Sequence, residues 1–303
     1  MIRYKSFNDS GLVAPSSAPR NQFYVDYNYG SDQNPGTKQL PFKTTDYAVG
    51  RCSVSGDTIY LMPGHNETIT AATVIDVDVA GITIEGLGNG TDMPTITYGS
   101  GTTVDIDASN IKIKNVKFSS PITGQETLLD VNYGDFTAED CIFECTSATS
   151  GPKSFIDLAT TKDNFKFKGC KFTSLADPVG VDGGVNTGCF YFVDSENIFV
   201  EDCYFSGYFE TAIFHNKTTA AKNVWVKNCY GTQLLSGGEV YTQVAEMTGG
   251  DINSTFVITG SADIAIANTW GVLSEHFFIS LTSGVGNDGA GGSLCVAAVS
   301  AAA

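Results

Sequence analysis

Positive charge is scarce in this chain of 303 residues. Lys and Arg together number 17 against 33 Asp and Glu, so the net charge is −16. Arginine occurs at three positions, Arg3, Arg20 and Arg51. A chain with this balance repels phosphate backbones and anionic lipid headgroups. We therefore expect neither nucleic acid nor a membrane as a partner.

Long apolar segments are missing as well. No stretch comes near the roughly 20 apolar residues that a membrane-spanning helix needs. The N-terminal segment MIRYKSFNDSGLVAPSSAPRN also lacks the apolar core of a secretory signal. We expect a protein that is made in the cytoplasm and is not exported through a signal peptide.

The residue patterns of common catalytic and metal sites are absent too. The eight cysteines form no CxxC pair, and the three histidines, His65, His215 and His276, lie far apart in the chain. We therefore predict no metal site and no cofactor. The sequence also contains no P-loop, no dinucleotide-binding fingerprint and no recognisable Ser-His-Asp set, which excludes several large classes of enzyme.

The chain contains one eight-residue pattern that recurs several times along the sequence. Its clearest form is FKFKGCKF at 165–172, and successive copies begin 25 to 33 residues apart. The copies begin at Ile82, Ile111, Phe136, Phe165, Ile198 and Val224. A fainter copy begins at Ile264. Repeats of this length indicate a solenoid, in which each unit packs against its neighbours.

Each place of the pattern has a constant character. Places 1 and 3 are apolar and places 2 and 4 are mostly polar, which is the alternation of a β-strand with one buried face. Place 5 is Gly, Asn or Asp, the residues that tolerate the left-handed backbone of a corner. Place 6 is Leu87, Val or Cys and place 8 is often Phe. We expect these two places to form buried columns, with the cysteines as free thiols rather than disulfides.

A further strand is expected ahead of four copies. Short segments with apolar ends stand at 104–106, 129–131, 156–158 and 190–192. Two or three short strands in each repeat predict an all-β fold, a single-stranded right-handed parallel β-helix.

Place 4 alternates in charge along the repeats. It is occupied by Glu85, Lys114, Glu139, Lys168, Glu201 and Lys227. Parallel strands lie about 4.8 Å apart, so coils in register would set each charge between opposite charges. A shift by one coil would bring like charges together, and we interpret the column as a ladder that fixes register.

The N-terminal part carries a resemblance. Residues 23–66 contain GSDQNPGT, PFKTT and GDTIYLMPG. They resemble the opening segment of many parallel β-helix repeat proteins, which is specific to the fold and is shared by lyases, hydrolases and viral structural proteins. With this resemblance we divide the chain into an extended arm at 1–22, a cap at 23–56, the β-helix at 57–270 and a C-terminal tail at 271–303.

Three aspartates are the best catalytic candidates. Asp105, Asp130 and Asp157 each lie between two apolar residues in the strand before a repeat, so stacked coils would place them one above another. Close carboxylates raise one another's pKa, which suits general acid catalysis or cation binding. The alternative is that they are solvated surface residues. The segment SENIFVEDCYF resembles the coils of pectin-degrading hydrolases, but the NTD, DD, GHG and RIK motifs of that family are absent.

Aromatic residues replace polar ones in the later copies. Place 2 becomes Phe199 and Trp225, and place 7 becomes Tyr204 and Tyr230. Exposed aromatic side chains are typical anchors of protein interfaces, although they also stack on sugars.

An acidic β-helix with such a face and without a catalytic motif resembles the structural proteins of tailed-phage virions. The resemblance implies a non-enzymatic, capsid-decorating (cement) protein of the virion that binds the major capsid protein and forms a homotrimer. The alternatives are a carbohydrate-active tailspike, lyase or hydrolase that uses the aspartate column, and a carbohydrate-binding fibre module without turnover.

Overall fold

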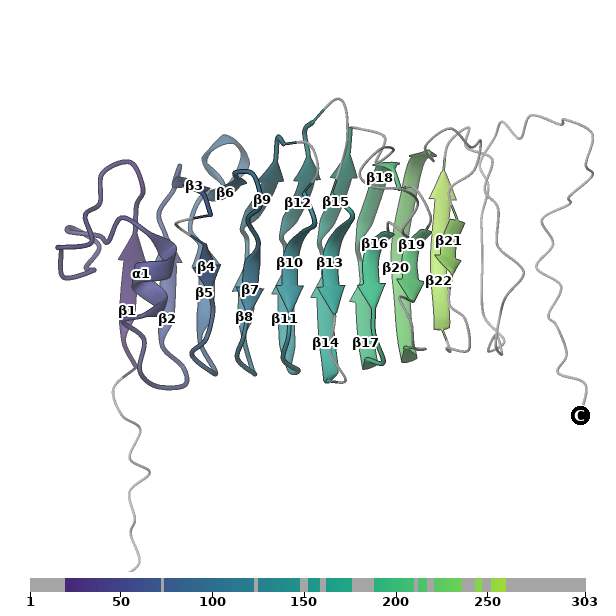
Figure 1. Ribbon diagram of the computed structural model, residues 1–303, viewed down its shortest axis with the longest axis horizontal. Coiled ribbons are helices and arrows are strands. Elements are labelled where there is room, and N and C mark those ends of the chain that lie inside the picture. Colours follow the sequence, from purple (N-terminus) through teal and green to yellow (C-terminus); the bar gives the residue numbers. More distant parts are fainter. Residues whose placement is uncertain are drawn as a thin grey trace, which may run out of the picture.

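The computed structural model is a parallel β-helix whose coils stack along one axis (Figure 1). It describes residues 20–71, 74–122, 125–147, 152–158, 162–175, 188–209, 212–216, 221–235, 243–246 and 252–259. The predicted C-terminal tail, the faint copy from Ile264 and nearly all of the N-terminal arm lie outside these ranges. Strand pairing within the described residues is parallel throughout. The expected all-β parallel β-helix is thereby confirmed.

The strands form three faces that run the length of the solenoid. The first face consists of β1 (Gln22–Val25), β2 (Thr58–Leu61), β5 (Thr83–Gly86), β8 (Lys112–Lys114), β11 (Phe136–Glu139), β14 (Asp163–Lys168), β17 (Glu196–Glu201) and β20 (Lys222–Leu235). The second face consists of β3 (Asn66–Ile69), β6 (Thr95–Tyr98), β9 (Lys117–Ser120), β12 (Ile142–Cys145), β15 (Lys171–Ser174) and β18 (Tyr204–Tyr208). The third face consists of β4 (Ile75–Asp76), β7 (Val104–Ile106), β10 (Thr127–Val131), β13 (Ser154–Leu158), β16 (Gly188–Phe192), β19 (Ala212–Asn216) and β21 (Gln243–Glu246).

The first two faces meet at the long strand β20. Its first half pairs with β17 and its second half with β18, so the two faces join into one 15-stranded sheet, and β22 (Ile252–Thr259) pairs with β20 in turn. The third face is a separate sheet of seven strands. It contains β7, β10, β13 and β16, which lie on the four short segments that the sequence predicted as strands.

Left-handed backbone at place 5 turns the chain between the first and second faces. The residues with φ between 52° and 64° at this place are Asn115, Asp140, Gly169, Asp202 and Asn228. The corners from Asn115 to Asp202 are each tied to the next coil, as in the hydrogen bond of 2.8 Å from the Asp140 N–H to the Lys168 carbonyl. A Cβ at Gly169 would lie 2.5 Å from Oδ1 of Asp140, so that side chain would have to move if another residue stood there. The predicted corners are therefore formed from Asn115 onward.

A second row of left-handed residues precedes place 1. Its members are Gly81, Asn110, Asp135, Asn164, Asn197 and Asn223, with φ between 55° and 78°. Asn and Asp side chains in neighbouring coils hydrogen bond, as in the 2.9 Å contact from Asn164 Nδ2 to Asp135 Oδ1. The sequence analysis missed this row, although Gly, Asn or Asp stands before every copy. Each strand of the first face from β5 to β20 thus has a left-handed residue just before its start or as its second residue.

The columns at places 6 and 8 fill the core. Sγ atoms of Cys141, Cys170, Cys203 and Cys229 donate to backbone carbonyls at 3.2–3.7 Å. All seven described cysteines are buried, and none of them forms a disulfide. Burial raises the pKa of the Cys170 thiol well above its usual value, so this thiol stays protonated. The expected free thiols are confirmed.

Place 8 forms a stack of rings. Phe118, Phe143, Phe172 and Phe205 follow one another with centroids 4.9–5.1 Å apart and interplanar angles of 7–8°.

The first copy differs at place 6. Leu87 is 38% exposed there, so the prediction that this residue is buried was wrong. Gly86 does not have the left-handed φ of the later corners, and the chain continues outward into the 3-10 turn η1 (Gly90–Asp92) instead of turning inward.

The segment predicted as a cap supplies both a strand and a helix. β1 pairs in register with β2, and α1 (Thr45–Val49) packs against β1, β2 and β4 at the N-terminal end of the solenoid (Figure 1). Ala48 and Val49 of α1 are buried, and Phe42 before it is 2% exposed. The helix therefore covers apolar residues that the first coil would otherwise present to water.

We expect Phe143→Ala to lower the free energy of unfolding by about 3–5 kcal/mol, because removing its ring leaves a cavity between Phe118 and Phe172. Urea unfolding followed by circular dichroism measures the change. Ile142→Ala is the matched control, because Ile142 lies half-buried on the outer side of the same strand and should cost under about 1 kcal/mol. Equal losses for the two variants would contradict the ring stack as a source of stability.

Candidate functional site

The six charged residues of place 4 occupy one column of the first face. Their Cα atoms are register partners in the order Glu85, Lys114, Glu139, Lys168, Glu201 and Lys227. Nζ of Lys114 lies 3.3 Å from Oε1 of Glu85, and this hydrogen bond raises the pKa of Lys114.

Two of the glutamates form ion pairs that run diagonally rather than along the column. Glu139 contacts Lys112 at 2.7 Å, and Glu201 contacts Lys166 at 3.9 Å, and each lysine stands at place 2 of the preceding coil. The expectation that every charge meets the one directly above it is therefore too simple, because long side chains also reach the neighbouring column. Exposed pairs of this kind contribute about 0.2–1 kcal/mol each.

The three candidate aspartates are also brought into register. Asp105, Asp130 and Asp157 are Cα partners on β7, β10 and β13, and Asp76 of β4 extends the column at its N-terminal end. At the other end the register continues through Tyr191, His215 and Glu246. The sequence analysis did not connect these three with the aspartates, because they belong to units with irregular spacing.

The acidic side of this column is crowded with carboxylates. Burial raises the pKa of Asp76, and the negative charges of Asp107, Asp78, Asp105 and Asp46 raise it further. Oδ1 of Asp76 is buried and has no hydrogen-bond partner among the described residues. Within those residues, however, no group of three His, Cys, Asp or Glu side chains has a geometry that could hold a metal ion.

The C-terminal side of the column is aromatic. The rings of Tyr191 and His215 stack with centroids 5.5 Å apart, and both side chains are at most 8% exposed. Burial and the negative charge of Asp157 raise the pKa of Tyr191. The column thus brings carboxylates, a phenol and an imidazole onto one face, while their use in catalysis stays a prediction.

The four aromatic residues of places 2 and 7 lie on two adjoining faces. Phe199 and Trp225 are register partners on the first face, and Tyr204 and Tyr230 are register partners on the second. Between the pairs stands the corner at Asp202. We call this group of four residues the aromatic corner.

The members of the aromatic corner differ in exposure. Trp225 and Tyr230 are 45% and 50% exposed, whereas Phe199 and Tyr204 are half-buried. The indole Nε1 of Trp225 donates to Oδ1 of Asn223 at 2.6 Å, which fixes the orientation of the ring. Nζ of Lys171 lies 5.6 Å from the centre of the Tyr204 ring. The last described coils therefore present two large, oriented aromatic side chains to solvent.

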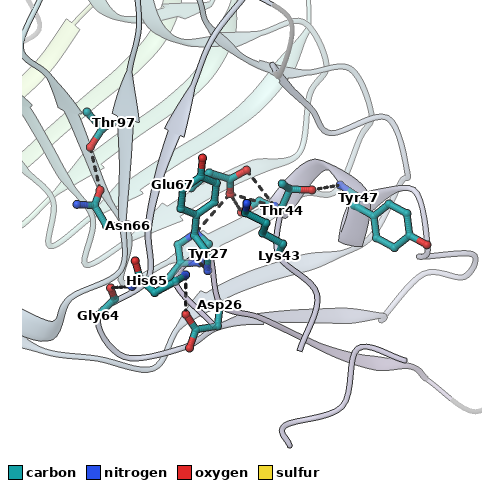
Figure 2. Close-up of polar contacts among 12 residues, drawn as sticks. Asp26, Tyr27, Lys43, Thr44, Tyr47, Gly64, His65, Asn66, Glu67 and Thr97 are labelled. Atoms are coloured by element: carbon teal, nitrogen blue, oxygen red, sulfur yellow. Dashed lines mark hydrogen bonds and ion pairs between the residues drawn. The ribbon is translucent and has the colours of Figure 1, made fainter. Parts of the chain in front are cut away.

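A buried polar network joins the cap to the first coils (Figure 2). His65 and Glu67 are 0% and 2% exposed, and His65 Nε2 lies 3.3 Å from Oε2 of Glu67. Nδ1 of His65 accepts the Tyr27 N–H at 3.1 Å, so the neutral ring carries its proton on Nε2. Glu67 in turn accepts from the N–H and the hydroxyl of Thr45, the first residue of α1. The network holds helix α1 on the solenoid, and His65 therefore has a structural role in joining the cap to the first coils.

A shallow groove lies on the first face and reaches the aromatic corner at Phe199. Its volume is about 330 Å³, and it is widely open to solvent. The lining residues are Asn110, Asp135, Thr137, Asn164, Phe165, Lys166 and Phe199. The sequence analysis missed the groove, because most of its polar wall comes from the left-handed row before place 1.

Comparison with known proteins finds neighbours among solved structures. No protein-family model and no curated protein matches the chain. Similar solved structures include a rhamnogalacturonan lyase, with 14% identity over 79% of this chain and 68% of the lyase, at a TM-score of 0.43. A GH136 lacto-N-biosidase from Eubacterium ramulus shows 13% identity over 80% of this chain and 52% of the enzyme, at a TM-score of 0.47.

A phage protein is also among the similar structures. ORF18 of Geobacillus virus E2 shows 15% identity over 78% of this chain and 57% of that protein, at a TM-score of 0.32. The chain is a parallel β-helix. Its neighbours include carbohydrate-active enzymes and a phage protein, and identities this low do not indicate the activity, substrate or partner of this chain.

None of the helices in the described residues is long and apolar enough to cross a membrane.

We expect Asp76→Asn to stabilise the protein at neutral pH, on the order of 0.5 kcal/mol, because it removes a charge that is disfavoured by burial and by several neighbouring carboxylates. The pKa of Asp76 is raised in the folded state, so its charge destabilises the fold above that pKa and ceases to do so once the pH falls below the ordinary value of 3.8. The gain should therefore fade between neutral pH and about pH 4, and it should shrink in high salt.

Urea unfolding at several pH values measures this difference. Asp92→Asn is the matched control, because Asp92 is an exposed carboxylate on η1. A stabilisation by Asp76→Asn that is the same at pH 4 and pH 7 would show that charge repulsion is not its cause.

Proposed function

We propose that this protein is a structural component of a tailed-phage virion, a decoration (cement) protein that binds the lattice of the major capsid protein as a homotrimer and performs no catalysis. The observation that carries the proposal is the aromatic corner, where Trp225 and Tyr230 stand 45% and 50% exposed on two adjoining faces. Large aromatic side chains that remain exposed on a rigid scaffold are characteristic anchors of protein interfaces.

The scaffold suits such a role. In-register coils hold the four rings of the aromatic corner at fixed spacings, so little side-chain or backbone entropy is lost when a partner binds. The net charge of −16 disfavours a phosphate backbone as that partner. In this proposal the two exposed rings of the aromatic corner, Trp225 and Tyr230, pack against a second copy of the chain, and the N-terminal arm reaches the capsid.

A polysaccharide-degrading tailspike, lyase or hydrolase remains the second candidate. The observation that favours it is the register of Asp105, Asp130 and Asp157 on one face, continued by Tyr191 and His215. Such an enzyme would release new reducing ends from a polysaccharide, whereas a decoration protein would not.

Replacing Trp225 and Tyr230 together with Ser should convert the homotrimer into monomers, because the two most exposed anchors of the interface are removed. Multi-angle light scattering at several protein concentrations measures the mass. Tyr29→Ser is the matched control, because Tyr29 is 87% exposed at the other end of the solenoid and lies outside the aromatic corner. An unchanged mass for the double variant would refute this interface.

Removing residues 1–19 should abolish binding to the capsid while the solenoid stays folded. This cut leaves Asn21 in place, whose backbone and side chain donate to the Asp57 carboxylate at 2.7 Å and 3.1 Å. Co-sedimentation with undecorated capsids measures binding, and circular dichroism measures folding. Wild-type occupancy by the shortened chain would count against the arm as the attachment site.

A further inference from the structure

The groove on the first face exists because one short side chain lies between long ones. Thr137 of β11 is the register partner of Lys112 on one side and of Lys166 on the other, and Phe199 follows Lys166 in the same column. A threonine side chain is several atoms shorter than lysine, so the outer surface dips at Thr137. The dip is the centre of the groove of about 330 Å³.

One wall of the groove carries polar groups in fixed positions. Asn110, Asp135 and Asn164 lie on successive coils, each with a left-handed φ between 57° and 69°. The 2.9 Å hydrogen bond from Asn164 to Asp135 holds two of the three side chains together. A carboxylate and two amides along one wall can both donate and accept hydrogen bonds.

Two further polar groups in the groove are available to a ligand. Neither the Asn110 amide nor the Thr137 hydroxyl has a hydrogen-bond partner among the described residues. The Lys166 ammonium is held only loosely, 3.9 Å from Glu201, and the Lys166 side chain is 42% exposed. The half-buried ring of Phe199, the register partner of Lys166, also lines the groove.

These features indicate the chemical class of the ligand. The volume falls at the lower end of the range of about 300–1,000 Å³ that small-molecule sites occupy. An aromatic ring beside several hydrogen-bonding groups suits a sugar, whose C–H face packs on the ring while its hydroxyls meet the amides and the carboxylate. A peptide that adds as an extra strand is excluded here, because β11 and β14 are each paired on both sides.

The charge of the whole chain selects among saccharides. Asp135 and Lys166 both line the groove and offset one another, so the net charge of −16 decides, and it repels a polyuronate or sulfated chain. We propose that the groove between Asn110 and Phe199 binds a unit of a neutral hexose oligosaccharide, with Phe199 as the stacking surface and Asn110, Thr137 and Asn164 as hydrogen-bonding groups. This site goes beyond the proposed function, since it lies one coil away from the exposed rings of Trp225 and Tyr230.

Binding can be followed through Trp225, the register partner of Phe199. The chain has two tryptophans, so a Trp270→Phe background makes Trp225 the single reporter. The probes are neutral gluco-, galacto- and manno-oligosaccharides, first on an array and then in fluorescence titration, with hexagalacturonate as the anionic comparator. We expect at least one neutral probe to bind with a Kd of about 0.1–5 mM, and hexagalacturonate to bind at least about tenfold more weakly.

Variants locate the site. Phe199→Ser and Asn110→Gly should each weaken binding of the neutral probe at least about fivefold, whereas Tyr204→Ser, which changes an aromatic residue on the other face, should change the affinity by less than about twofold. Asn110 is exposed and glycine tolerates its φ of 59°, so Asn110→Gly keeps the test valid if Phe199→Ser fails to fold.

The proposal is overturned if no neutral probe binds up to about 10 mM, if hexagalacturonate binds best, or if Tyr204→Ser weakens binding as much as Phe199→Ser. Light scattering of the Trp225 and Tyr230 double variant reports separately on the trimer, so failure of the glycan site and failure of the proposed function give different results.

Discussion

The whole structure depends on coils that lie in register, one directly above another. Backbone hydrogen bonds between coils supply this order, and the left-handed residues near the start and at the corner of each first-face unit recur at equal places of the repeat. The Asp140 N–H, for example, donates to the Lys168 carbonyl of the next coil, and the Asp202 N–H donates to Lys227. Asn, Asp and Gly are used there because other residues tolerate positive φ poorly.

Register turns a linear repeat into surface columns. Each outward place of the pattern becomes a row of side chains about 4.8 Å apart, so a change of residue type along the row changes the local surface. The row at place 2 passes from Thr137 through Lys166 to Phe199 and Trp225, and with it the surface passes from a polar groove to an exposed aromatic corner. On the third face the same principle gathers acidic residues at one end and aromatic ones at the other.

The charged ladder has more effect on specificity than on stability. Its members are between a quarter and two-fifths exposed where they form ion pairs, and such pairs contribute little to the free energy of folding. If the coils paired one unit out of register, however, lysine would lie beside lysine and glutamate beside glutamate along the column. Buried rings and thiols supply the stability, while the alternation of charge discourages the wrong stacking.

The sequence by itself determined the coil and its corners, because strand alternation and the conformational preference of Asn, Asp and Gly are local properties. It also predicted which residues share a column, since equal places in a regular repeat must stack. Tertiary structure decided the rest. The dip at Thr137, the division of the aromatic residues over two faces, and the meeting of His65 with Glu67 and Thr45 depend on distances between coils and on the packing of the cap, which no local pattern records.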